Sequence, residues 1–126
     1  YLFDMELLEE APGTTAGRFR ALNDRVRLAA RVSDRGETID RALAIEAASI
    51  IWLDEFDGPH FTARDVARLH AEGRQVHVVS PELHGAPYQV ARARWFEFLD
   101  WGVDGICTDY PAALDRVLRN LSEKAA

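Results

Sequence analysis

The sequence has little of several features that commonly identify a class of protein. It contains a single cysteine, Cys107, which excludes an internal disulfide and any paired-cysteine zinc site. No apolar run is long enough to cross a membrane. The chain does not open with a basic stretch, a short apolar segment and a small-residue cleavage site, which together mark a signal peptide. These absences favour a cytoplasmic protein with no membrane span.

A concentration of positive charge is also missing. The formal net charge is -6 at pH 7, which argues against a surface for nucleic acid or an anionic membrane. The basic residues are dispersed along the chain, as in Arg18, Arg20, Arg25, Arg27 and Arg31. We therefore expect a small-molecule or protein partner rather than a nucleic acid.

The length and composition are those of one globular domain. The chain has 126 residues, of which 48% are hydrophobic and 29% charged, as in ordinary globular proteins with a real core. It begins at Tyr1, without a methionine and directly inside an apolar run. This beginning favours a missing upstream region.

Five apolar runs alternate with helical patterns. The predicted strands cover residues 1–7, 27–32, 49–56, 75–79 and 104–108. Isoleucine, valine, leucine and aromatic residues follow one another there without strict alternation, which is typical of parallel strands covered on both faces. Strand–helix alternation predicts an α/β domain with parallel β-α-β crossovers.

The predicted helices carry their own start and stop signals. Thr62 and Asp65 form a capping-box pattern, Gly73 and Gly102 are placed to end helices, and Pro111 suits a first helical turn. The predicted helices cover residues 14–24, 37–48, about 63–72, 89–101 and 111 onward. Their expected inward residues are Ile39, Leu43, Ala47, Val66, Leu69, Leu114, Val117, Leu118 and Leu121, together with Val90, Trp95 and Leu99 or their neighbours.

Two architectures fit this order of elements. One is a five-stranded, flavodoxin-like doubly wound sheet, which this length fills. The other is the C-terminal half of a TIM-type (β/α)8 barrel, strands four to eight with their helices, because a whole barrel needs about 250 residues. In both, ligands bind at the carboxyl ends of the strands.

The predicted strand ends are rich in polar residues. Carboxylates that converge there from several strands would form a site for a hard divalent cation, Mg²⁺ or Ca²⁺, which could neutralise phosphate oxygens. The polar residues at or near these ends are Asp4, Glu6, Arg31, Ser33, Asp34, Glu37, Asp54, Glu55, Asp57, Ser80, Glu82, His84, Thr108 and Asp109.

Glu82 and His84 form the most informative pair. A histidine close to a carboxylate can act as a general acid or base near neutral pH. Surface loop residues explain this short motif almost as often. Simple structural roles also account for other positions: Asp57 as a turn residue, Glu37 in a first helical turn, Asp109 as an N-cap and Trp52 in the core.

The run from Gly102 to Pro111, Gly-Val-Asp-Gly-Ile-Cys-Thr-Asp-Tyr-Pro, resembles the last strand of the glycerophosphodiester phosphodiesterase-like superfamily. Residues 71–79 resemble the helix and strand seven of that fold. Residues 79–85 and 52–56 are closer to its poorly characterised members. The resemblance covers most of the chain and implies the C-terminal half of a barrel that cleaves a small phosphodiester with the help of a metal.

The resemblance implies that Asp4 would bind the metal and that the other strand ends would supply much of the substrate-facing rim. Within this hypothesis His84 and Glu82 are the candidate catalytic residues. The candidate substrate-binding residues are Arg31, Trp52 and Asp54. The superfamily's His-Arg-Gly and Glu-x-Asp motifs are absent here, and Glu6 stands where a lysine often follows the acidic ligand. The chain alone is therefore not expected to hydrolyse a phosphodiester by the family mechanism, and it would need the missing N-terminal half.

Two alternatives stay open. The chain could be a receiver-like signalling domain, in which Asp4 helps to hold Mg²⁺, Asp54 accepts a phosphoryl group and Ser80 is the switch hydroxyl. It lacks the lysine expected after the fifth strand, because the only lysine is Lys124. The other alternative is a non-catalytic half-barrel that covers its open edges by forming a homodimer.

Overall fold

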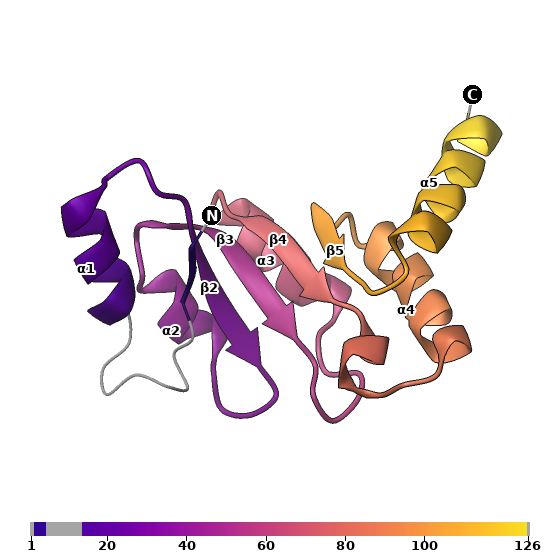
Figure 1. Ribbon diagram of the computed structural model, residues 1–126, viewed down its shortest axis with the longest axis horizontal. Helices are drawn as coiled ribbons and strands as arrows, with labels where there is room; N and C mark the ends of the chain where they lie inside the picture. The colour runs from indigo at the N-terminus through magenta and orange to yellow at the C-terminus, as the bar shows by residue number, and fades with distance from the viewer. Residues whose placement is uncertain (1, 5–13, 126) are drawn as a thin grey trace.

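The structure is a computed structural model that describes residues 2–4 and 14–125, with side chains described from residue 17 onward. Five parallel strands form one sheet in the order β1-β2-β3-β4-β5 (Figure 1). The strands are β1 (Leu2–Asp4), β2 (Leu28–Ser33), β3 (Ala48–Asp54), β4 (Gln75–Val79) and β5 (Gly105–Cys107). The prediction of an α/β domain with a parallel sheet and flanking helices is confirmed.

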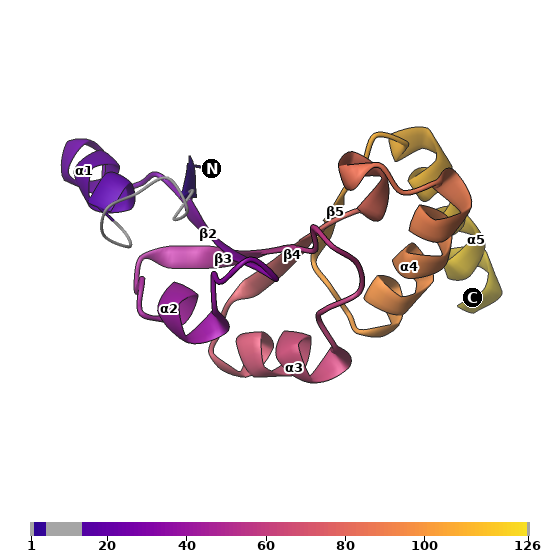
Figure 2. The same ribbon diagram turned by 90° about the horizontal axis from the view of Figure 1, so that it is seen from below.

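Helices connect the strands in turn. They are α1 (Thr14–Leu22), α2 (Ile39–Leu43), α3 (Ala63–Ala71), the short 3-10 helix η2 (Pro81–His84), α4 (Tyr88–Asp100) and α5 (Pro111–Ala125). Seen from below, α2 and α3 lie on the same face of the sheet, and α4 and α5 follow near β5 (Figure 2). Among the described residues, no helix has both the length and the apolar character needed to cross a membrane.

The main core lies between the sheet and α2, α3 and α4. Alternate residues of the central strands supply one side of it, among them Val32, Leu53 and Val78, and Leu69 and Phe98 pack on them from α3 and α4. A second cluster joins α4 to α5 through Trp95 and Val117. Because side chains alternate along a strand, the residues between those core positions point to the other face of the sheet.

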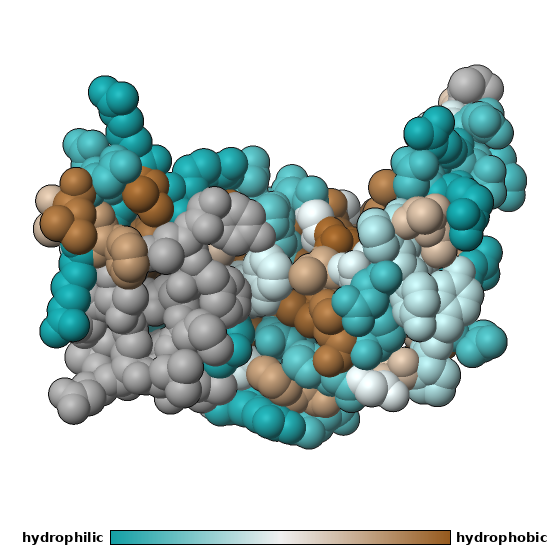
Figure 3. Space-filling model, viewed as in Figure 1, coloured by the Kyte–Doolittle hydropathy of each residue, from teal (hydrophilic) through white to brown (hydrophobic). Residues whose placement is uncertain are grey.

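That second face carries a row of larger polar and aromatic side chains. The strand register places Arg31 beside Trp52, Trp52 beside His77, and His77 beside Gly105. A Cβ atom added to Gly105 would lie 3.1 Å from the His77 ring, so the small residue leaves room for the histidine. Figure 3 shows apolar surface near the centre of the molecule in this view, with hydrophilic side chains to its right.

Several predicted details agree with the structure. The strand predicted at residues 75–79 has those bounds, and the capping box of Thr62 and Asp65 is formed. Gly73 and Gly102 adopt positive φ angles of 73° and 76° at the ends of α3 and α4, a conformation that glycine adopts readily. The prediction for residues 5–7, including Glu6, lies outside the described residues.

The helix predicted at residues 37–48 is wrong in its length. Helix α2 ends at Leu43, with Ala44 as its C-cap, and Ala47 is exposed rather than inward. The chain instead turns after the helix, with Ile45 N–H bonded to Ala42 O and Ala48 N–H to Ile45 O. These turns bring the chain directly to the start of β3, which leaves no room for another helical turn.

The predicted inward face of α4 agrees with the structure within one residue, whereas that of α5 needs correction. In α4, Trp95 is buried, and Ala91 is buried in place of its neighbour Val90, which is 52% exposed. In α5, Leu114 and Val117 are buried, but Leu118 and Leu121 are exposed. The second apolar cluster reaches only the first half of α5, so within the described residues no element covers the later part of the stripe.

Candidate functional site

The carboxyl ends of β3, β4 and β5 bring together the most chemically active group of side chains. β3 ends at Asp54, β4 leads through Ser80 into η2, and β5 leads to Thr108 and Asp109. Parallel strands place these ends at one edge of the sheet. We call Asp54, Phe56, Ser80, Glu82 and His84 the rim site.

An aspartate and a histidine pair at the centre of the rim site. His84 Nε2 lies 2.5 Å from Asp54 Oδ1, and the two side chains are 23% and 7% exposed. The Phe56 ring packs on the imidazole with ring centres 4.3 Å apart. A carboxylate in this position fixes the orientation and the tautomer of a histidine ring. Among the described residues Nδ1 makes no hydrogen bond, so this nitrogen can meet a substrate.

Glu82 belongs to a different network. Its carboxylate accepts hydrogen bonds from the hydroxyls of Ser80 and Thr108 and, at 3.0 Å, from the Asp109 amide. Ser80 Oγ in turn accepts the Trp95 indole N–H at 2.6 Å. Burial raises the pKa of Glu82, but the Ser80 and Thr108 hydroxyls and the backbone amides lower it further, so the pKa falls below its usual value. Glu82 thus ties β4 to the segment after β5, and its described contacts do not include His84.

The Glu82 network predicts a loss of stability in acid. Because the pKa of Glu82 is lower in the folded than in the unfolded protein, its ionised carboxylate stabilises the fold. This stabilisation is fully present above the ordinary glutamate pKa of 4.5, and it is lost as the pH falls through the lower pKa of the folded state. We expect Glu82→Gln to be less stable at neutral pH and to lose less further stability on acidification than the wild type. Urea unfolding of both proteins between about pH 7 and pH 3 measures this difference. Parallel stability curves for the two proteins would contradict it.

Arg31 lies in a buried cluster near the end of β2. Its Nε donates to Glu37 Oε1 at 2.8 Å, and Ser33 Oγ donates to the same oxygen at 2.9 Å. Arg31 is 6% exposed and Glu37 1% exposed. Its guanidinium lies 5.7 Å from the Phe56 ring centre, so Arg31 approaches the rim site at Phe56. Glu37 is the ion-pair partner of Arg31 and precedes the N-cap Thr38, so the interpretation of Glu37 as a first-turn helix residue is wrong.

The remaining predicted residues lie elsewhere. Trp52 is in the middle of β3, on the sheet face away from the main core, with its ring centre 6.4 Å from that of His77. The backbone of Asp4 pairs with Ala30 at the end of β1, but its side chain lies outside the described residues. Asp109 does not cap α5, because Tyr110 accepts the first amides of that helix, those of Ala113 and Leu114.

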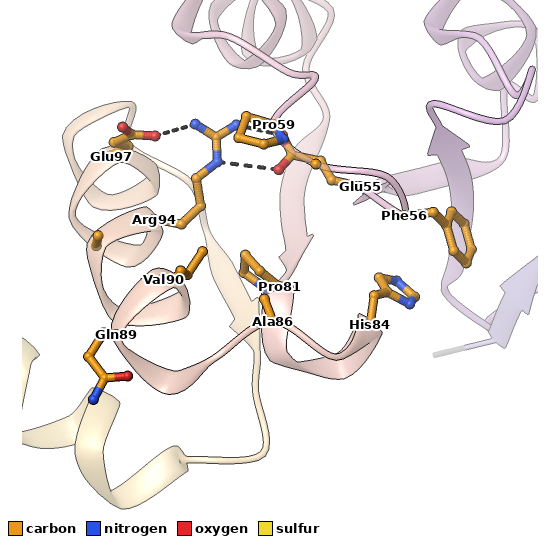
Figure 4. A pocket seen from close by; sticks show the side chains of 12 residues that line it. Glu55, Phe56, Pro59, Pro81, His84, Ala86, Gln89, Val90, Arg94 and Glu97 are labelled. Carbon is orange, nitrogen blue, oxygen red and sulfur yellow. Dashed lines mark hydrogen bonds and ion pairs between the residues drawn. The ribbon is translucent and has the colours of Figure 1, made fainter.

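A cavity of about 470 Å³ opens beside the rim site, between α4 and the segment after β3. His84 and Phe56 lie at one side of it, and Arg94 with Glu55 and Glu97 at the other (Figure 4). The residues between are mainly apolar: Gly58, Pro59, Pro81, Ala86, Val90 and Ala93, with Gln89 at the margin. A volume of this size falls in the range of ligand pockets.

The cavity's charged side is held by a buried ion pair. Arg94 Nη2 lies 2.5 Å from Glu55 Oε1, and the side chains are 9% and 4% exposed. Glu55 Oε1 also accepts the amides of His60 and Phe61, each at 3.0 Å, while Arg94 bonds Glu97 as well. Burial lowers the pKa of Arg94, but its bonds to Glu55 and Glu97 raise it more, so the guanidinium stays charged.

The described residues do not by themselves form a metal centre. No group of three or more histidine, cysteine, aspartate or glutamate side chains in the described part of the chain could hold an ion. Asp54 is bonded to His84, and Glu82 to its three donors. A metal role for Asp4 falls on a side chain outside the described residues.

Sequence reasoning named Asp54, Ser80, Glu82 and His84 as candidates, but it named neither Phe56 nor the pairing of Asp54 with His84. Asp54 and His84 are 30 residues apart. Only their positions near the ends of predicted strands could have indicated that they lie close together. It missed Arg94, which lies 39 residues from Glu55. The sequence did contain a signal for Arg94, because this arginine stands between Ala93 and Trp95 on the apolar side of a predicted helix.

Comparisons with known proteins assign no relationship: no protein family, no curated protein and no solved structure matches this chain.

Proposed function

We propose that the rim site hydrolyses a small phosphodiester, with His84 as the acid–base residue and Asp54 as the residue that positions it. The observation that carries this proposal is the Asp54–His84 pair, 2.5 Å long, at the carboxyl ends of parallel strands beside a cavity. A histidine that a carboxylate holds in place can act as a general acid or base, and strand ends are where α/β proteins bind substrates. The resemblance to the glycerophosphodiester phosphodiesterase-like superfamily points to the same reaction.

The strand order supports the C-terminal half of a barrel as the architecture. Each strand lies next to the one before it, in the order β1-β2-β3-β4-β5. A flavodoxin-like sheet reverses direction, with the order 2-1-3-4-5, whereas a (β/α)8 barrel keeps the chain order throughout. In this proposal β1 and β5 correspond to strands four and eight, and the other half of the barrel pairs with their free edges.

The described residues can perform one proton transfer of the hydrolysis. As the bond from phosphorus to the leaving oxygen breaks, protonated His84 gives its Nδ1 proton to that oxygen, and the Asp54 carboxylate stabilises the imidazolium before the transfer. Water adds to phosphorus and releases one proton to solvent, and His84 takes one proton back. The products are a phosphomonoester and an alcohol.

A divalent cation is part of the proposal only through Asp4, since the described carboxylates of the rim are engaged by other groups. When bound, Mg²⁺ or Ca²⁺ would neutralise phosphate oxygens. The position of Asp4 at the carboxyl end of β1 is compatible with this role.

The direct test is hydrolysis of bis(4-nitrophenyl) phosphate by the full-length natural polypeptide, with Mg²⁺, with Ca²⁺ and with a chelator. We expect release of 4-nitrophenol that a chelator abolishes and either ion restores. Absence of turnover under all three conditions would contradict the proposal. A parallel incubation with acetyl phosphate tests the receiver-like alternative, since that alternative requires a phosphorylated Asp54 that mass spectrometry can detect.

A further inference from the structure

The cavity beside the rim site has a chemistry of its own. Most of its wall consists of apolar groups from two segments, Gly58 and Pro59 after β3 and Pro81 to Ala93 across η2 and α4. Figure 4 shows Val90, Ala86 and Pro81 between Arg94 on one side and His84 on the other. Val90 is 52% exposed, so a ligand in the cavity can contact its side chain.

The charges of the cavity are already matched within the protein. All three guanidinium nitrogens of Arg94 are used, by Glu55, Glu97 and the Phe61 carbonyl. Arg94 also lies over the Phe98 and Trp101 rings, at 4.9 and 4.7 Å from their centres. A charged ligand group inside the cavity would therefore have to compete with buried bonds, whereas an apolar group would only displace water.

The cavity extends to the Asp54–His84 pair. His84 and Phe56 belong to the cavity lining and also to the rim site. Arg35 lies with its guanidinium 4.3 Å from the centre of the Phe56 ring and forms an exposed ion pair with Asp57 at 3.2 Å. A phosphate that meets His84 would compete with Asp57 for this exposed guanidinium, and the apolar cavity lies next to it.

We propose that this cavity binds the aryl or alkyl group of an organophosphate whose phosphate lies at His84. The inference rests on the proposed function of the rim site and names its substrate class: phosphodiesters with one apolar substituent. The volume of about 470 Å³ is about three times the roughly 150 Å³ that encloses one benzene ring. It therefore accommodates a bicyclic aryl group or a short alkyl chain.

Calorimetric titration of the full-length polypeptide with 1-naphthyl phosphate, methyl phosphate and inorganic phosphate tests this proposal without requiring catalysis, because the two esters are the monoester products of such diesters. We expect the naphthyl ester to bind at least about tenfold more tightly than the methyl ester, because its ring leaves water. Ala93→Phe, which fills the cavity, should abolish this difference and leave the affinity for inorganic phosphate unchanged. Ala67→Phe is the matched control, since Ala67 is exposed on α3 and lies outside the cavity.

A second variant, Val90→Asp, covers the case in which Ala93→Phe does not fold, because Val90 is exposed and its replacement leaves the core intact. It should also reduce the preference for the naphthyl ester. Equal affinities for the naphthyl and methyl esters would overturn the proposal, as would a naphthyl preference that survives both cavity variants. Binding of neutral 1-naphthol as tightly as of its phosphate would overturn the link to His84. A cavity-dependent naphthyl preference without any diester hydrolysis would support the binding site while refuting the proposed reaction.

Discussion

Replacing His84 with alanine is expected to reduce phosphodiester turnover by about 10²- to 10⁴-fold, the usual contribution of a general acid or base. Asp54 holds Nε2 at 2.5 Å, and in the proposed reaction Nδ1 is the nitrogen that gives its proton to the substrate. The measurement is kcat for bis(4-nitrophenyl) phosphate with the full-length polypeptide. Asp54→Asn should also lower kcat, by a smaller factor, because the histidine would remain but lose the carboxylate that orients it.

A second histidine of the same chain provides a matched control. His70 Nε2 lies 2.8 Å from Asp104 Oδ2, and this carboxylate also accepts the Val76 amide near the start of β4. The His70–Asp104 pair thus has similar chemistry at the amino end of the sheet, away from the rim site. His70→Gln should keep kcat within about twofold of the wild type. Equal losses in the His84 and His70 variants would show that the effect is one of folding and would refute the role of His84.

The largest expected effect on stability comes from Arg94. Arg94→Ala leaves Glu55 as a buried carboxylate without its cation, and breaking a buried pair in this way costs about 3 to 5 kcal/mol. For a domain of this size the melting temperature should fall by about 10 to 20 °C. Urea and thermal unfolding of the two proteins give the change in free energy.

Two further variants separate the buried pair from general effects of losing an arginine. Arg119→Ala removes an exposed ion pair with Asp115, whose side chains are 73% and 56% exposed, and should cost less than about 1 kcal/mol. In the double variant Arg94→Met and Glu55→Gln, the glutamine oxygen can still accept the His60 and Phe61 amides, so part of the lost stability should return. A cost for Arg94→Ala no greater than that for Arg119→Ala would show that the buried pair contributes little.

Local patterns predicted the elements of this fold because local physics determines them. The apolar run of residues 75–79 forms β4 with those bounds, and the Thr62–Asp65 capping box depends only on neighbours three residues apart. The exposed Leu118 and Leu121 show the limit of such patterns. Spacing tells which residues share one side of a helix, whereas the position of other elements decides whether that side is covered.

The site was predicted less completely, for a geometric reason. Glu82 and His84 are two residues apart, which favoured a pair, but they lie on a 3-10 helix. Such a helix has about three residues per turn, so side chains two positions apart point about 120° from each other. His84 therefore meets Asp54 of β3, and Glu82 meets Ser80 and Thr108. The partners come from strands whose neighbours in space are distant in sequence, and no local pattern identifies them.

The four residues of η2 have a consequence for engineering of this protein. Through Glu82 they connect β4 to the segment after β5, and through His84 they reach the end of β3. A loop transplanted in their place would have to reproduce both attachments as well as the left-handed Gly85 that closes the turn, with φ of 90°. Substrate specificity is therefore better redesigned in α4. Val90 and Ala93 can be replaced there one at a time while the contacts of η2 with the ends of β3, β4 and β5 stay intact.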